Sequence, residues 1–190
     1  MVEHRNSQKR VYEENTIYFV TIKTFQNFPY FKEKIFCDLW IEELKLTKRL
    51  KKFELYAFCL NYDHSHLLLK PNKEFNISKV MKSLKENFSR DANYIIENYY
   101  YEGDTSTYRL RMRNWIRQFQ TQFIQKYGPN QHLAPKFKWQ KSFHDYIIRN
   151  QNDFEKHYNY AIYNFQKHGL PDDWKYTSLN FVNLIDEIEI

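Results

Sequence analysis

Two histidines, His64 and His66, are the residues whose types and spacing most directly suggest chemistry in this sequence. They begin an apolar run, with Ser65 between them and three leucines after them. If this run is a β-strand, its side chains alternate between two faces, so both imidazoles point the same way from positions roughly 6–7 Å apart. Two imidazoles at that spacing can bind one divalent metal ion. Two solvated histidines at the start of a strand would give the same pattern.

A second group of candidate residues lies in the stretch 152–168. If this stretch is a helix, Tyr160 and Asn164 share one face, and His157 and His168 lie on nearby turns of that face. A metal ion held by two imidazoles and one amide oxygen keeps open positions, where it could polarise a phosphodiester for attack by a tyrosine oxygen. A tyrosine with a free pKa of about 10 needs help to lose its proton, and a histidine or a metal-bound hydroxide could provide it. Tyr160 could also be one of 16 tyrosines that simply pack through their rings.

Composition narrows the class of protein. A chain of 190 residues with 42% hydrophobic residues is long enough for one domain with a sizeable core. Its 3 glycines exclude the Gly-rich loops that bind nucleotide phosphates. A net charge of +6 with 19% aromatic residues suits nucleic acid, because cations meet phosphates and rings stack on bases. A modest positive charge is also common in proteins that bind no nucleic acid.

The two cysteines, Cys37 and Cys59, are too few and too far apart for a disulfide framework or a cysteine-rich zinc site. We interpret them as reduced core residues of a cytoplasmic protein. The polar N-terminal residues lack the apolar segment of a secretory signal, and no apolar run approaches the roughly 20 residues of a membrane span. We therefore expect no membrane partner.

The elements that must position these residues follow from the periodicity of the apolar side chains. Runs of β-branched and aromatic residues predict strands, apolar residues at steps of three and four predict helices, and Asn and Asp predict a hairpin turn. The tail 183–190 fits a short strand or a frayed end. The predicted strands are 16–25, 53–60, 64–70 and part of 139–149, and the predicted helices are 35–51, 77–99, 108–127 and 152–168.

The order of these elements indicates the fold class. Without the helix at 108–127, strands and helices follow the order of a ferredoxin-like split β-α-β unit, with one further helix appended. We predict an α+β fold: a ferredoxin-like antiparallel sheet with helices on one face, an inserted helix and a C-terminal tyrosine-bearing helix. Residues 1–190 then form a single domain with an insertion at about 101–137.

Three segments in order, LNYDHSHLLLK, WQKSFHDYIIRN and FEKHYNYAIYNFQKHGL, resemble the REP-associated tyrosine transposases, a branch of the single-tyrosine HUH transposase family. The resemblance covers roughly residues 16–100 and 138–175. It identifies His64 and His66 with metal-binding histidines, Tyr160 with the nucleophile and Asn164 with the third metal ligand.

The resemblance implies metal-dependent cleavage and strand transfer of single-stranded DNA through a covalent 5′-phosphotyrosine intermediate. The DNA expected from this family forms hairpins, and the metal is Mg²⁺ or Mn²⁺. His157 and His168 are candidates for proton transfer to and from the tyrosine. Both monomers and homodimers occur in such enzymes, and the sequence does not choose between them.

Three departures from the family pattern bear on this expectation. Ser65 replaces an apolar residue between the histidines, and we expect its side chain to face away from the metal and to affect packing alone. Phe165 replaces a proline after Asn164, which lets the helix run on towards Gly169. The third departure is the insertion at 101–137, and together the three suggest a divergent member.

Contacts with DNA are less readable from the sequence. Trp139 is a candidate stacking platform. Candidate phosphate contacts are Lys82, Lys85, Lys138, Lys141 and Arg149, together with four arginines at 109, 111, 113 and 117. The alternative function is a non-catalytic protein that binds single-stranded or hairpin nucleic acid and derives from such a transposase. An unrelated metallohydrolase is less favoured, because barrel hydrolases with His-x-His need more ligands and a longer chain.

Overall fold

The computed structural model describes residues 15–97, 125 and 136–188. Apart from residue 125, the predicted helix at 108–127 lies outside the described residues, as do its four arginines and most of the proposed insertion. None of the helices in the described part of the chain has the length and apolar character needed to cross a bilayer.

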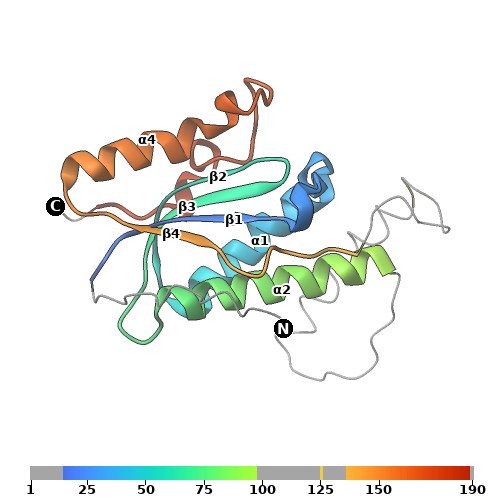
Figure 1. The fold of residues 1–190 in the computed structure, drawn as a ribbon, viewed down its shortest axis with the longest axis horizontal. Coiled ribbons are helices and arrows are strands. Elements are labelled where there is room, and N and C mark those ends of the chain that lie inside the picture. Colours follow the sequence, from blue (N-terminus) through green and yellow to red (C-terminus); the bar gives the residue numbers. More distant parts are fainter. Residues whose placement is uncertain (1–14, 98–124, 126–135, 189–190) are drawn as a thin grey trace, which may run out of the picture.

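Four antiparallel strands form one sheet in the order β2-β3-β1-β4 (Figure 1). They are β1 (Tyr18–Lys23), β2 (Glu54–Leu60), β3 (His64–Lys70) and β4 (His144–Ile147). The first and third strands of the chain occupy the centre of the sheet, as in a ferredoxin-like split β-α-β fold. The predicted α+β class with an antiparallel sheet is confirmed.

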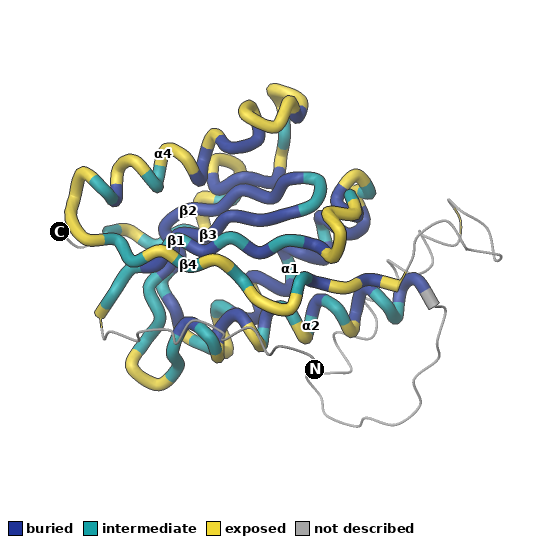
Figure 2. The backbone as a smooth tube through the Cα atoms, viewed as in Figure 1, coloured by how far each residue is buried: buried dark blue, intermediate teal, exposed yellow. Residues whose placement is uncertain are grey.

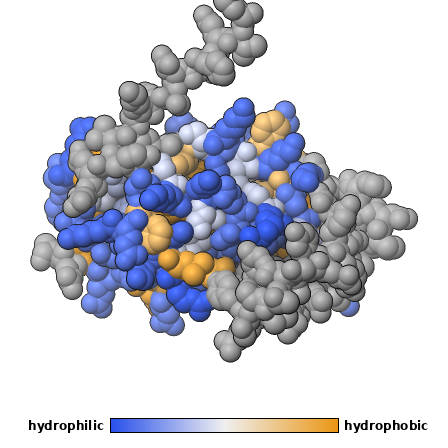
Figure 3. Space-filling model, turned by 90° about the horizontal axis from the view of Figure 1, so that it is seen from below, coloured by the Kyte–Doolittle hydropathy of each residue, from blue (hydrophilic) through white to orange (hydrophobic). Residues whose placement is uncertain are grey.

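Helices cover both faces of this sheet (Figure 1). The helices α1 (Lys34–Lys51) and α2 (Ile77–Glu97) pack on one face, and α4 (Gln151–Lys167) lies on the other, over β2 and β3. Figure 2 shows that β2 and β3 are almost wholly buried, whereas β4 carries exposed positions. The outer surface on the side of α2, seen in Figure 3, is largely hydrophilic. The helices therefore cover both faces of β2 and β3, whereas side chains of β4 remain exposed to solvent.

A β-bulge in β2 sets which side chains face α4. Leu55 pairs with Leu69, and Ala57 pairs with Leu68, so Tyr56 is an extra residue between them. Tyr56 and Ala57 both join the apolar cluster beneath α4, while Leu55 joins the core on the side of α1 and α2.

The C-terminal tail covers the free edge of β2. Residues Ser178–Asn180 and Val182–Leu184 form short 3₁₀ helices. Residues 183–188 contain no strand, so the strand that was one of our two expectations for 183–190 is absent from the described part of that tail. The Ser178 hydroxyl bonds both backbone groups of Phe58, and the Asp186 carboxylate accepts from the Leu55 amide at 2.7 Å. Exposed strand edges invite pairing with other chains, so this cover protects the sheet.

The helix α4 begins at an Asn150 cap, whose side-chain oxygen accepts from the Asp153 amide at 2.9 Å. As predicted, the helix continues past Phe165, because no proline interrupts it. Gly169 then adopts a left-handed backbone with φ of 64°, and the Leu170 amide donates to the Phe165 carbonyl at 3.0 Å. The helix therefore continues for at least one full turn beyond Tyr160, and this part of it carries Asn164.

Candidate active site

The two histidines of β3 face α4 together. His64 and His66 are each 5% exposed, and their ring centroids lie 4.9 Å apart. Ser65 projects to the opposite side and donates its hydroxyl hydrogen to the Cys59 carbonyl at 3.2 Å. The alternation of side chains along a strand therefore places the imidazoles as the sequence predicted. Ser65 lies away from them, which agrees with a packing role.

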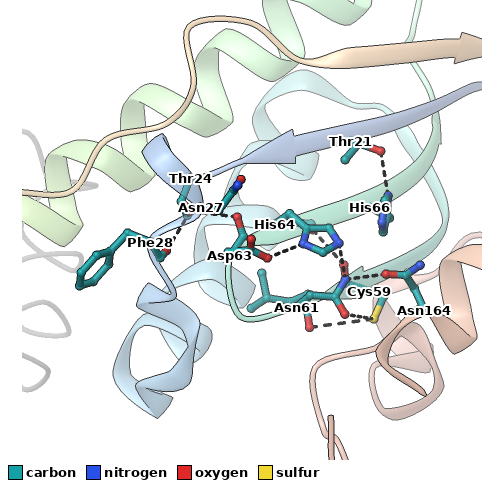
Figure 4. Close-up of polar contacts among 12 residues, drawn as sticks. Thr21, Thr24, Asn27, Phe28, Cys59, Asn61, Asp63, His64, His66 and Asn164 are labelled. Carbon is teal, nitrogen blue, oxygen red and sulfur yellow. Dashed lines mark hydrogen bonds and ion pairs between the residues drawn. The ribbon is translucent and has the colours of Figure 1, made fainter. Parts of the chain in front are cut away.

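Asn164 reaches the histidines from α4 (Figure 4). Its side chain is 2% exposed, and its Oδ1 accepts a hydrogen bond from Asn61 Nδ2 at 2.8 Å. The same Asn61 nitrogen lies 3.1 Å from His64 Nε2 (Figure 4). Asn61 thus connects the hairpin turn between β2 and β3 with the helix that carries Asn164.

Polar partners orient both imidazole rings. His64 Nδ1 lies 2.6 Å from the Asp63 carboxylate, so Nδ1 donates and Nε2 presents its lone pair towards Asn61. His66 Nδ1 lies 2.8 Å from Thr21 Oγ1 on β1. Its Nε2 atom is buried and has no hydrogen-bond partner within the described part of the chain. A buried nitrogen without a partner is costly, which makes it a candidate metal-binding atom.

Burial keeps the His66 imidazole neutral. Burial, and after it the charges of neighbouring groups, lower the pKa of His66 to about 3. The hydrogen bond from His64 lowers the pKa of Asp63, which favours its carboxylate form. The neutral form of an imidazole is the one that binds a metal ion, and a carboxylate at the other ring nitrogen orients the ring for it.

Tyr160 stands one helical turn before Asn164 on α4. Its ring lies edge-on to His66 at 5.2 Å and to Phe19 at 5.7 Å, with Lys167 Nζ 5.0 Å from its centroid. The side chain remains 37% exposed. Tyr160 therefore contacts a candidate ligand while it stays open to a substrate.

The two candidates for proton transfer, His157 and His168, have different surroundings. The His168 ring is 4.6 Å from the His64 ring, beyond Asn164. The His157 ring stacks on Tyr146 of β4 at 4.6 Å, and its Nδ1 donates to the Asp153 carbonyl at 2.8 Å. Which histidine serves Tyr160 stays a prediction.

The structure separates the proposed DNA contacts. Lys82 and Lys85 lie on α2, across the sheet from the histidines. Lys85 Nζ donates to the carbonyls of Gln140 and Ser142 at 2.7 and 3.1 Å, so it ties α2 to the segment before β4. Lys82 is exposed and lies 3.8 Å from the Glu86 carboxylate. Neither lysine is brought to the candidate site.

Trp139 lies in the large core and is only 8% exposed. Its ring packs against Trp40 at 5.5 Å, Phe137 at 4.9 Å and Phe88 at 5.5 Å. A ring enclosed in this way cannot stack on a base, so burial argues against the predicted stacking platform. Lys138, Lys141 and Arg149 are exposed, and Arg149 lies 5.7 Å from the Tyr146 ring centroid.

A divalent metal ion at this site would use both nitrogen and oxygen atoms. Across residues 15–97 and 136–188, no cluster of three His, Cys, Asp or Glu side chains could hold a metal. A site here therefore needs the Asn164 amide oxygen beside His64 Nε2 and the unpartnered His66 Nε2.

Three residues that support this site escaped the sequence analysis as site residues: Thr21, Asn61 and Asp63. Asp63 had a usable signal, since a carboxylate directly beside His64 commonly orients a metal-binding imidazole. Asn61 and Asp63 were interpreted as turn formers only. Thr21 has no local signal, because it meets His66 only through the pairing of β1 with β3.

Comparisons with known proteins agree with this architecture. A family model described as "Transposase IS200 like" matches residues 29–107. A protein of Haemophilus influenzae, provisionally named as a REP-associated tyrosine transposase, is 28% identical over 183 residues, which cover 92% of this chain and 86% of the relative. The solved structure of a REP-associated tyrosine transposase bound to a REP hairpin matches with a TM-score of 0.62 at 18% identity. That match covers 98% of this chain and 89% of the other, and it shows the shared fold. The recognition made from the motifs is confirmed: this chain resembles the REP-associated tyrosine transposases in sequence and in fold.

Proposed function

We propose that this protein is a metal-dependent transesterase that cleaves and rejoins single-stranded DNA through a covalent 5′-phosphotyrosine at Tyr160. One observation carries the proposal: the Tyr160 ring contacts His66, one helical turn from Asn164 and beside His64. A nucleophile and three metal donors meet in one place, on the face of the sheet that α4 covers.

His64, His66 and Asn164 would hold Mg²⁺ or Mn²⁺, which would act as a Lewis acid on the phosphodiester. Asp63 fixes the tautomer of His64 through the contact at Nδ1, and Thr21 holds the ring of His66. With Nδ1 engaged in each ring, Nε2 is the nitrogen of His64 and of His66 that would bind the metal.

Tyr160 performs the covalent step. Its phenolic oxygen attacks phosphorus, the 5′ phosphate remains on the tyrosine, and the other product leaves with a 3′-OH. Attack by a 3′-OH on the phosphotyrosine reverses the step and restores a phosphodiester with a new partner strand. The tyrosine proton passes to a histidine. His168 suits this role because burial lowers its pKa, so that it is neutral and able to accept a proton.

The DNA would reach Tyr160 from the open side of the sheet. The helix α4 packs over β2 and β3, which leaves exposed side chains on β4, such as His144 and Tyr146, beside the site. Arg149 adds a cation near Tyr146. A hairpin is the ligand of the solved relative, and a hairpin-bearing single strand is the substrate we propose for this chain. A cytoplasmic location fits its two free, buried cysteines.

The test is a search for the covalent adduct. The protein is incubated with labelled hairpin-bearing single-stranded DNA and Mn²⁺, and the products are separated on a denaturing gel. Tyr160→Phe should abolish the adduct while retaining the ring contacts with His66 and Phe19. The matched control is Tyr163→Phe, which changes a neighbouring tyrosine that is even more exposed. If the adduct survives in Tyr160→Phe and is lost in Tyr163→Phe, the nucleophile is Tyr163 and not Tyr160.

A second candidate function is a non-catalytic hairpin-binding protein. One observation favours it: hydrogen bonds from Asn61 already satisfy His64 Nε2 and Asn164 Oδ1. Two metal donors are thus occupied by a side chain. In the same gel experiment, tight binding to several hairpins without any adduct would support this function over catalysis.

A further inference from the structure

Asn61 occupies an unusual position for a turn residue. Its side chain is 1% exposed, and its Nδ2 atom donates to two atoms at once, at 2.8 Å to Asn164 Oδ1 and 3.1 Å to His64 Nε2. The two atoms that accept these hydrogen bonds are the atoms that would bind the metal ion in the site proposed above. The amide nitrogen therefore sits at the point where the two lone pairs converge (Figure 4).

That position is incompatible with a shared metal ion. A divalent ion binds imidazole nitrogen and amide oxygen at about 2.0–2.2 Å, and His64 Nε2 has a single lone pair, which now accepts an Asn61 hydrogen. A lone pair that accepts a hydrogen bond cannot bind a metal at the same time. The Asn61 amide and a metal held by both His64 and Asn164 therefore exclude each other.

We propose that the Asn61 side chain is an internal competitor for the metal, which must swing away before His64 and Asn164 bind the ion. The proposal rests on the proposed function, because it uses the same metal site. The hydrogens of Asn61 take the place of the cation and hold the two ligands together across the interface between the hairpin turn and α4. Asn61 would thus lower metal affinity and preserve the shape of the site.

The local contacts allow the side chain to move while the backbone stays fixed. The backbone N–H of Asn61 donates to the backbone carbonyl of His64 at 2.7 Å, and this bond anchors the turn. The Asn61 Oδ1 meets only the Cys59 thiol, at a long 3.9 Å, among the described contacts. A rotation about the side-chain bonds therefore sacrifices mainly the two hydrogen bonds of Nδ2. Two such bonds correspond to roughly tenfold or more in affinity.

The test measures Mn²⁺ binding without DNA. Metal-depleted full-length protein is titrated with Mn²⁺, and the free ion is followed by electron paramagnetic resonance. Asn61→Ala should bind Mn²⁺ about tenfold more tightly than the wild type, because the competing amide is gone. Unfolding temperatures provide a second readout: Asn61→Ala should be less stable without Mn²⁺ and should gain more from adding it. If the alanine variant does not fold, Asn61→Ser removes the same amide with a smaller change.

Two further variants control the measurement. Asn93→Ala also removes an asparagine with two hydrogen bonds, both to the backbone of Phe137, but far from the histidines. Its Mn²⁺ affinity should equal that of the wild type. Asn164→Ala should lose Mn²⁺ binding, with or without the change at Asn61.

Each other outcome overturns the proposal in a recognisable way. Weaker binding by Asn61→Ala would make Asn61 a metal ligand, and unchanged binding would show that its amide does not compete. Both results would leave the proposed function intact. If neither the wild type nor the variant binds Mn²⁺, the metal site itself fails, and the proposed function fails with it.

Discussion

The two faces of the sheet are filled in different ways. The face under α1 and α2 has one large core dominated by aromatic rings, including Phe31, Trp40, Phe88, Phe137 and Trp139. The face under α4 has two small apolar clusters, with the polar residues His64, His66 and Asn164 buried beside them. The first face supplies most of the apolar core, and the second carries the candidate site.

Buried polar atoms without a hydrogen-bond partner occur on both faces of the described structure. On the α4 face, His66 Nε2 and Asn164 Nδ2 are buried without a hydrogen-bond partner among the described residues. Trp40 Nε1, Thr47 Oγ1 and Trp139 Nε1, on the side of α1 and α2, share this property, so such atoms lower stability on either face. The large core has an anomaly of its own in Glu43, a buried carboxyl whose neighbours include Asp91. Four changes, ordered by expected effect, test whether stability and chemistry are divided between the faces.

Phe88→Ala should produce the largest loss of stability. Phe88 is fully buried, and its ring packs against Phe31, Trp40, Phe137 and Trp139. Removing such a ring leaves a cavity and should lower the free energy of unfolding by about 3–5 kcal/mol. Urea denaturation measures this change. A loss below 1 kcal/mol would show that the large core does not dominate stability.

His66→Ala should separate chemistry from binding on the opposite face. Loss of a metal ligand removes Lewis-acid catalysis worth several kcal/mol, so adduct formation should fall by at least about a hundredfold. Hairpin binding in a gel-shift assay should change little. Parallel loss of binding and cleavage would instead assign His66 a structural role.

Glu43→Gln should stabilise the protein at neutral and alkaline pH. Burial, followed by the hydrogen bond and negative charge of Asp91, raises the pKa of Glu43 far above its ordinary value. The folded state then holds a proton that the unfolded state releases, so stability falls as the pH rises from about 5 towards 9. Glutamine carries no such proton and should gain about 1–3 kcal/mol at the upper end of this range. Unfolding curves across this pH range measure the difference, and identical slopes for the two proteins would contradict it.

The smallest effects should distinguish Arg149 from Lys85. Arg149→Ala should weaken hairpin binding several-fold and reduce its salt dependence by the equivalent of about one phosphate contact. Lys85→Met should leave hairpin affinity unchanged and reduce stability by about 1 kcal/mol, because Lys85 donates to two backbone carbonyls. Fluorescence anisotropy at several salt concentrations compares the two variants. Equal losses of affinity would place the DNA on both faces.

Local periodicity predicted much of this arrangement. Alternation along β3 put His64 and His66 on one face, and a spacing of four residues put Tyr160 and Asn164 on one turn of α4. The order of elements was enough to indicate the ferredoxin-like sheet. These features depend on residues that are close in sequence, so one chain contains their signal.

Tertiary contacts account for what could not be predicted. Asn61 meets Asn164 across 103 positions, and no pattern near either residue announces that contact. Trp139 resembles a surface ring in sequence, yet the bridge between Thr24 and Trp139 draws it into the core. The same limit applies to Lys85, whose partners lie more than fifty positions away. A solvated lysine and a lysine that donates to two distant backbone carbonyls have the same local sequence pattern.

The end of α4 has a consequence for stoichiometry. Phe165 is 4% exposed and packs with Cys59 of β2 and with Leu170, which follows the helix. Phe154, near the other end of α4, likewise packs in the apolar cluster with Tyr56 and Leu68, so both ends of the helix are fixed to the sheet. In the structure, Tyr160 lies against His66 of the same polypeptide. On the proposed function, an activity per chain that stays constant on dilution would show that one polypeptide forms a whole active site, and a loss on dilution would show that two copies share it.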